Sequence, residues 1–137
     1  MNETNIMNAE TDAVRQPFTF AGRLRSLSHA LAGIRLMLRS QHNAWVHAAV
    51  TIAVLAASAV LGLTRVEWCA VVIAIASVWT AEALNTALEF LCDVTSPEFH
   101  PAVKNAKDVA AGAVLITAVG AAVVGGLVLG PKLLAFL

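Results

Sequence analysis

Charged residues are scarce in this chain. Only 13% of its 137 residues are charged and 58% are hydrophobic, at a mean hydropathy of +0.74. A soluble domain of this size would be about a quarter charged and close to half apolar. The shortage of charge excludes an ordinary soluble domain and indicates a single small integral membrane domain.

The chain also lacks an excess of basic residues. Nine Lys and Arg are balanced by nine Asp and Glu, so the formal net charge is zero. Binding to nucleic acid depends on basic residues that neutralise backbone phosphates, and no basic block is present here. We therefore expect no nucleic-acid partner.

Two familiar chemical signatures are missing as well. The chain has two cysteines, Cys69 and Cys92. On one helix they would lie about 35 Å apart, too far to form a disulfide. No glycine-rich segment leads into the Lys-Ser or Lys-Thr of a phosphate-binding loop, so the glycines after residue 109 indicate close helix packing instead.

Three long apolar runs are present, at about residues 46–63, 66–91 and 109–129. Each approaches or exceeds the roughly 18–20 residues that a helix needs to cross a bilayer. We predict an all-α integral membrane protein with three transmembrane helices at these positions. The polar residues 1–19 are predicted to form a disordered tail, and residues 20–137 the membrane domain.

A different pattern precedes the first apolar run. From Phe20 to Ser40, leucine and isoleucine recur at spacings of three and four, which is typical of one face of a helix. These residues are Leu24, Leu27, Leu31, Ile34 and Leu38. Most arginines of this segment lie off that stripe, so the pattern predicts an amphipathic helix lying in the membrane interface.

The basic residues also predict an orientation. Five arginines precede the first span and two lysines lie between the second and third, whereas Arg65 alone lies between the first and second. Positive residues favour the cytoplasmic side. We therefore predict a cytoplasmic N-terminus and an external C-terminus.

The second apolar run carries a polar stripe, which we define as Glu82, Asn85, Glu89 and Asp93. At about 100° per residue these positions fall within an arc of about 80° on one helix face. Acidic residues within a membrane span are costly and usually mark a pathway or an active site. The stripe is therefore a candidate site.

The connection between the second and third runs adds further charged residues. Lys104, Lys107 and Asp108 share one helix face just before the third run. Because the connection is short, we predict that the end of the third helix carrying Lys107 and Asp108 faces the end of the polar stripe that carries Glu89 and Asp93.

Carboxylates opposite lysine allow more than one interpretation. An ion-pair cluster could be purely structural, and Glu82 could be the protonation site of a small proton-coupled transporter. Phosphoryl transfer instead needs oxygen ligands for magnesium, cations on the phosphates and a base. Glu82 lies about 16 Å deeper than Asp93, where a lipid hydroxyl could reach it. The transporter hypothesis gives Asn85, Lys107 and Asp108 no common role.

Several segments together resemble the prokaryotic diacylglycerol kinase family, which includes the undecaprenol kinases. The matching residues are 81–89, Asp93, 98–101 and 106–115, and the resemblance extends from about Arg23 to Lys132. It implies an ATP- and Mg²⁺-dependent kinase of a membrane lipid alcohol, either diacylglycerol or undecaprenol. It also implies a homotrimer with composite sites in the bacterial inner membrane.

The resemblance assigns roles to the matching residues. Glu82 would be the catalytic base, Glu89 a Mg²⁺ ligand, and Asn85 and Lys107 phosphate contacts. The remaining nucleotide-binding candidates are Glu98, His100 and Asp108, toward the nucleoside end, and Asp93, which would belong to the same cytoplasmic cluster. Gln41 stands where the family commonly has a second metal-binding glutamate. An amide oxygen can bind Mg²⁺ but brings no charge, so we predict weaker metal binding.

Overall fold

The structure is a computed structural model that describes residues 19–136. Apart from Thr19, the predicted disordered tail lies outside the described residues. The described residues form four helices and no strand: α2 (Phe20–Ser40), α3 (His42–Val60), α4 (Arg65–Thr95) and α5 (Pro101–Phe136). The prediction of an all-α protein is confirmed.

The chain divides into two compact units, residues 1–35 and 36–137, with the boundary inside α2. The described part of the first unit is α2 as far as Arg35. Thr19 begins this helix, because its side-chain oxygen accepts a hydrogen bond of 3.1 Å from the backbone N–H of Gly22. Leu24, Leu27, Leu31 and Ile34 of the apolar stripe of α2 are exposed. This pattern agrees with the predicted amphipathic helix.

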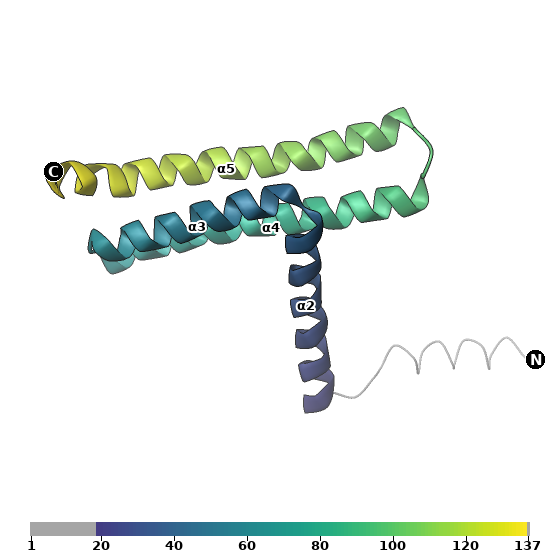
Figure 1. The fold of residues 1–137 in the computed structure, drawn as a ribbon, viewed down its shortest axis with the longest axis horizontal. Helices are drawn as coiled ribbons and strands as arrows, with labels where there is room; N and C mark the ends of the chain where they lie inside the picture. The colour runs from purple at the N-terminus through teal and green to yellow at the C-terminus, as the bar shows by residue number, and fades with distance from the viewer. Residues whose placement is uncertain (1–18, 137) are drawn as a thin grey trace, which may run out of the picture. The chain divides into compact units, whose positions relative to one another are not determined.

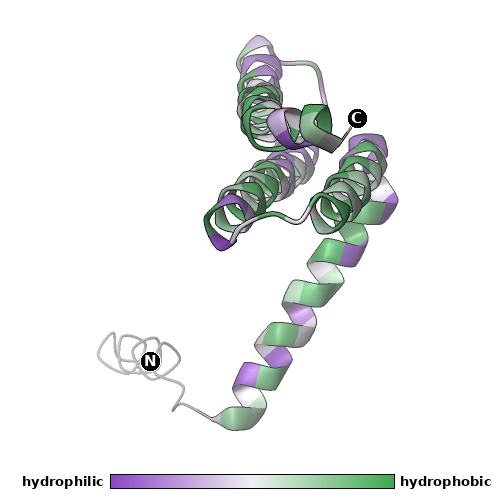
Figure 2. Cartoon of the chain, turned by 90° about the vertical axis from the view of Figure 1, so that its left-hand side faces the viewer, coloured by the Kyte–Doolittle hydropathy of each residue, from purple (hydrophilic) through white to green (hydrophobic). Residues whose placement is uncertain are grey.

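The second unit is a bundle of α3, α4 and α5. Figure 1 shows the three helices side by side, with α4 and α5 antiparallel and joined by a short connection, and α4 and α5 share the most extensive contact. Hydrophobic residues cover most of the three helices in Figure 2. All three are long and apolar enough to span a membrane, as predicted from the three apolar runs.

The turn between α3 and α4 ends the first span earlier than predicted. α3 ends at Val60, not near residue 63, because Gly62 adopts a left-handed conformation with φ of +62°. Thr64 and Glu67 then form a capping box that starts α4. Lys132 of α5 reaches this turn, with its Nζ 3.2 Å from Glu67 Oε2. These contacts hold together the end of the bundle that carries the C-terminus.

At the opposite end, α4 and α5 continue well beyond the predicted spans. α4 has 31 residues and α5 has 36, whereas α3 has 19. At 1.5 Å per residue these lengths are about 46, 54 and 28 Å, against about 30 Å for the hydrocarbon core. Pro101, a favourable first helical residue, begins α5. The ends of α4 and α5 on this side therefore include polar residues that lie outside the predicted apolar runs. Several of the candidate site residues are among them.

Candidate functional site

Glu82 is the deepest acidic residue of the polar stripe. Its residue surface is 1% exposed, and neither carboxylate oxygen has a hydrogen-bond partner among the described residues. Burying an unpaired carboxylate costs several kcal/mol, so folding alone gives no reason to keep it. Such a group is typical of a site where a ligand or substrate completes the environment.

About two turns further along α4, Glu89 is held by two amides. Gln41 Nε2 donates a hydrogen bond of 2.7 Å to Glu89 Oε2, and Asn85 Nδ2 donates one of 3.0 Å to Glu89 Oε1. Gln41 comes from the residue just before α3, so the contact joins two segments distant in sequence. Asn85 is buried, and its Oδ1 has no partner among the described residues.

These side chains line one cavity of about 280 Å³, which we call the polar cavity. Its polar side chains are Gln41, Asn43, His47, Glu82, Asn85 and Glu89. Residues of α5 close another side, including Ala111 and Val114. Glu82 and Glu89 are separated by about 10 Å along the helix axis. The cavity therefore brings together two acids, three amides and an imidazole.

Beyond the polar cavity, the connection between α4 and α5 frames a second cavity of about 310 Å³, the loop cavity. Its charged and titratable side chains are Asp93, Glu98, His100, Lys104, Lys107 and Asp108. Lys107 Nζ lies 2.5 Å from Asp93 Oδ1, which joins α5 to α4. This contact confirms the prediction that the Lys107 end faces the Asp93 end. Lys104 pairs with Asp108 along α5.

The two cavities together contain all nine residues predicted from the sequence. Gln41, Glu82, Asn85 and Glu89 line the polar cavity, and Asp93, Glu98, His100, Lys107 and Asp108 line the loop cavity. The polar stripe is therefore divided between a buried part, which includes Glu82 and Asn85, and an exposed end at Asp93. Its members share a helix face but not the same degree of burial.

His47 belongs to the site although the sequence-based assignment omits it. Its Nε2 lies 3.8 Å from Glu82 Oε2, across the interface between α3 and α4. Its ring meets the ring of Trp79 edge to face, with centroids 6.3 Å apart. The sequence does contain a signal for His47: it lies inside the first apolar run, and an ionisable residue inside a membrane span is itself a candidate functional residue.

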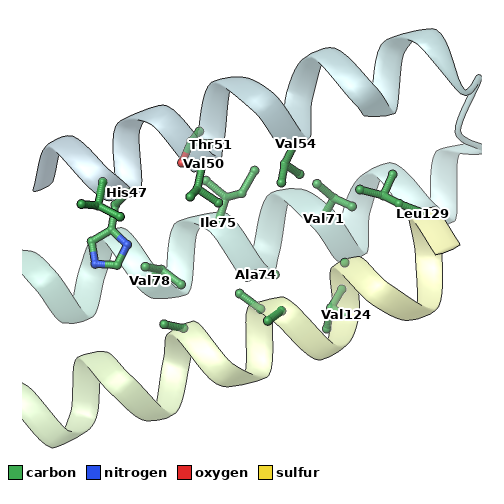
Figure 3. Close-up of a pocket in the computed structure, with 15 residues that line it drawn as sticks. His47, Val50, Thr51, Val54, Val71, Ala74, Ile75, Val78, Val124 and Leu129 are labelled. Atoms are coloured by element: carbon green, nitrogen blue, oxygen red, sulfur yellow. The ribbon is translucent and has the colours of Figure 1, made fainter. Parts of the chain in front are cut away.

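A third cavity, of about 470 Å³, lies between α3, α4 and α5 and is almost wholly apolar, so we call it the apolar cavity. Its lining is valine, isoleucine, leucine, alanine and glycine apart from His47 and Thr51. Figure 3 shows His47 at one end and Leu129 at the other. Val46, His47 and Ala118 line both this cavity and the polar cavity, so the two adjoin.

The donor set of the polar cavity fits Mg²⁺ bound together with phosphates. Within residues 19–136 no three His, Cys, Asp or Glu side chains are placed to hold a metal ion by themselves. Mg²⁺, however, is usually held by one or two carboxylates together with substrate phosphates and water. The Glu89 carboxylate and the unpartnered Asn85 Oδ1 supply such oxygens, and the Gln41 amide adjoins them.

A bundle of membrane-spanning helices with these carboxylates, amides and lysine at one end defines a membrane-embedded enzyme. Residues 28–129 match the family described as Prokaryotic diacylglycerol kinase. The chain belongs to this family and is a multi-pass membrane lipid kinase. Membership in a kinase family decides against the transporter hypothesis.

Two curated relatives carry related names. The chain is 38% identical over 109 residues to the undecaprenol kinase of Bacillus subtilis, covering 80% of this chain and 89% of that protein. It is 37% identical over 115 residues to the diacylglycerol kinase of Synechocystis sp., covering 83% of this chain and 66% of that protein. The two relatives are thus named for different lipid alcohols.

The burial of Glu82 leads to a prediction about stability. Glu82→Gln removes a buried charge whose oxygens accept no hydrogen bond and whose contact with His47, at 3.8 Å, is longer than one, so we expect a thermal unfolding temperature no lower than that of the parent. Glu67→Gln is the matched control on the same helix. Glu67 accepts from the Thr64 backbone N–H and pairs with Lys132, so this variant should melt at a lower temperature. A destabilised Glu82→Gln would mean that Glu82 has a structural role.

Proposed function

We propose that this kinase transfers the γ-phosphate of ATP to the hydroxyl of diacylglycerol or undecaprenol, with Glu82 as the catalytic base. The observation that carries the proposal is the unpartnered carboxylate of Glu82 in the polar cavity, next to the apolar cavity. A lipid alcohol has an apolar body and one reactive hydroxyl. The adjoining cavities offer both environments.

In the proposed reaction the lipid oxygen attacks the γ-phosphorus. The hydroxyl proton passes to a Glu82 carboxylate oxygen, a new O–P bond forms, and the bond from the γ-phosphorus to the β–γ bridging oxygen breaks to release ADP. A base must be within hydrogen-bond reach of the proton it accepts, and free oxygens meet this need. Glu82 then returns the proton to solvent.

The loop cavity supports a nucleotide at the outer end of the site. Lys107 pairs with the carboxylate of Asp93, which carries one negative charge. A triphosphate carries several, so it would attract the Lys107 ammonium group more strongly than Asp93 does. We infer that Lys107 and Asn85 contact the phosphates. The exposed Asp93, Glu98, His100 and Asp108 then offer hydrogen-bond partners to the ribose and base.

Mg²⁺ would be held by Glu89, the Asn85 amide oxygen and Gln41, completed by phosphate oxygens and water. The ion would neutralise phosphate charge as the γ-phosphoryl group is transferred. The amide groups of Gln41 and Asn85 fix the Glu89 carboxylate before any ion arrives. Binding the ion through amide oxygen requires Gln41 to present its Oε1 instead of its N–H.

We further propose that the loop cavity faces the cytoplasm, where ATP is available, and that the protein is a homotrimer of the bacterial inner membrane. Gly112, Gly120 and Gly126 support assembly, because a Cβ built on each meets no atom within 4 Å. These small residues are not used for close packing among the described residues. A second copy can pack closely on such a face.

The first functional prediction concerns Glu82 and the acceptor. Purified protein in vesicles with labelled ATP should phosphorylate diacylglycerol or undecaprenol, each offered separately, and Glu82→Gln should lower the rate by at least about 10²-fold because the base is lost. Glu67→Gln, at the other end of α4, is the control and should retain activity at a temperature where it is folded. Parental activity in Glu82→Gln would exclude it as the base.

The second functional prediction concerns Gln41 and the Mg²⁺ requirement. Gln41→Glu adds a carboxylate beside Glu89, so half-maximal activity should require less Mg²⁺. The same variant should melt at a lower temperature than the parent without metal, because two carboxylates then repel each other where an amide had donated a hydrogen bond. Added Mg²⁺ should reverse that difference. Identical Mg²⁺ titrations of parent and variant would show that position 41 does not contact the ion.

The third functional prediction concerns assembly of the proposed homotrimer. Mass measurement in a mild detergent should give three copies for the active species, and dissociation by a harsher detergent should remove activity. Gly120→Leu should shift the mass toward the single chain, because in the isolated chain the larger side chain meets nothing. A monomer with full activity would contradict the composite-site proposal.

A further inference from the structure

His47 has no part in the roles assigned so far, although it is the nearest charged or titratable partner that the structure gives Glu82. Among the described residues, the ion-pair contact of Glu82 is with His47, at 3.8 Å between Nε2 and Oε2. The imidazole is mostly buried, with 17% of its side chain exposed. A mostly buried histidine beside a buried carboxylate calls for an explanation other than surface charge.

The position of the His47 ring is fixed by a second contact across the same pair of helices. Trp79 Nε1 donates a hydrogen bond of 3.1 Å to Thr51 Oγ1. His47 and Thr51 are four residues apart on α3, and Trp79 and Glu82 are three residues apart on α4, so each pair shares a helix face. The indole ring of Trp79 meets the His47 imidazole edge to face. Trp79 is thus tied to α3 one turn away from the His47–Glu82 contact.

His47 also occupies the junction of two environments. It lines both the polar cavity and the apolar cavity, and it lies at one end of the apolar cavity in Figure 3. A lipid alcohol that leaves its hydrocarbon in the apolar cavity and presents its hydroxyl to Glu82 would lie beside this ring. His47 is therefore placed to control how the Glu82 carboxylate meets the hydroxyl.

We propose that His47, whose ring meets that of Trp79, is a positioning residue for Glu82 in the phosphoryl transfer. This inference rests on the proposed function, in which Glu82 is the base. The imidazole N–H holds Oε2 and leaves Oε1 free to accept the proton of the acceptor hydroxyl. The 3.8 Å separation is longer than a hydrogen bond, and catalytic hydrogen bonds often tighten only when the substrate is bound.

A purely structural histidine would act differently. If His47 only filled space between α3 and α4, an apolar side chain of similar size would serve as well, and any loss would appear as lower thermal stability. A positioning role instead requires an N–H donor at this point. Loss of that donor would lower the rate of the transfer step and leave the affinity for nucleotide in the loop cavity unchanged.

The test compares His47→Leu with His47→Gln in the full chain in vesicles, with labelled ATP and the acceptor that the parent uses. Misplacing a catalytic group by about 1 Å can cost about 10²-fold in rate. We expect His47→Leu to lower kcat by about 10–100-fold with the KM for ATP within about twofold of the parent. His47→Gln keeps an N–H donor and should recover several-fold in kcat over His47→Leu.

Thr51→Val tests the support of the ring, because it removes the acceptor of the Trp79 N–H without touching Glu82. We expect a loss of kcat smaller than that of His47→Leu. Thr117→Val is its matched control: the Thr117 hydroxyl bonds only to backbone oxygens of its own helix, so kcat should stay at the parental value. His29→Gln, an exposed histidine of α2, controls for loss of a histidine in general.

The outcomes separate the two proposals. Parental kcat in His47→Leu, or equal losses in His47→Leu and His47→Gln together with lower melting temperatures, would overturn the positioning role while the kinase assignment of Glu82 stands. A parent chain that phosphorylates neither diacylglycerol nor undecaprenol would overturn the proposed function, and this inference with it.

Discussion

The candidate site is built around the buried carboxylate of Glu82. Neither of its oxygens has a hydrogen-bond partner among the described residues. Glu82 would be less costly as glutamine or leucine if packing alone mattered, since an unpaired buried charge is destabilising. The bundle is held together elsewhere, through the contact between α4 and α5 and through the capped turn at the other end. Apart from the 3.8 Å contact with His47, the described residues give the Glu82 carboxylate no partner, and in the proposed function a substrate meets it there.

Helix length separates the nucleotide from the lipid. α3 is about as long as the hydrocarbon core is thick, whereas α4 and α5 are about half as long again or more, so both continue past the start of α3. The polar cavity lies level with the start of α3 and the loop cavity lies beyond it. One continuous helix, α4, thus carries Glu82 into the apolar region and Asp93 out of it. In the proposed function this arrangement lets a water-soluble and a lipid substrate approach one site.

Much of this could be predicted from the sequence, because the signals were local and periodic. Apolar runs predicted the three spans, a spacing of three and four predicted α2, and the polar stripe predicted one shared face of α4. Helix ends were less predictable: Gly62 stopped α3 early, and α4 and α5 extended through polar residues that a count of apolar residues ignores. The contact of His47 with Glu82 depends on how α3 and α4 pack, and no spacing within either segment specifies it.

Gln41 changes the electrostatics of the outer part of the polar cavity. A glutamate here would face Glu89, and two carboxylates at that distance repel each other until a cation binds. With glutamine the Glu89 carboxylate is already hydrogen-bonded without a metal ion, since both of its oxygens accept amide N–H groups. A cation that binds Glu89 must then displace two hydrogen bonds. It also meets one negative charge fewer than it would with glutamate at position 41. In the proposed function, Mg²⁺ binding would therefore depend more strongly on the phosphates that accompany the ion, so that metal and nucleotide would bind together rather than in sequence.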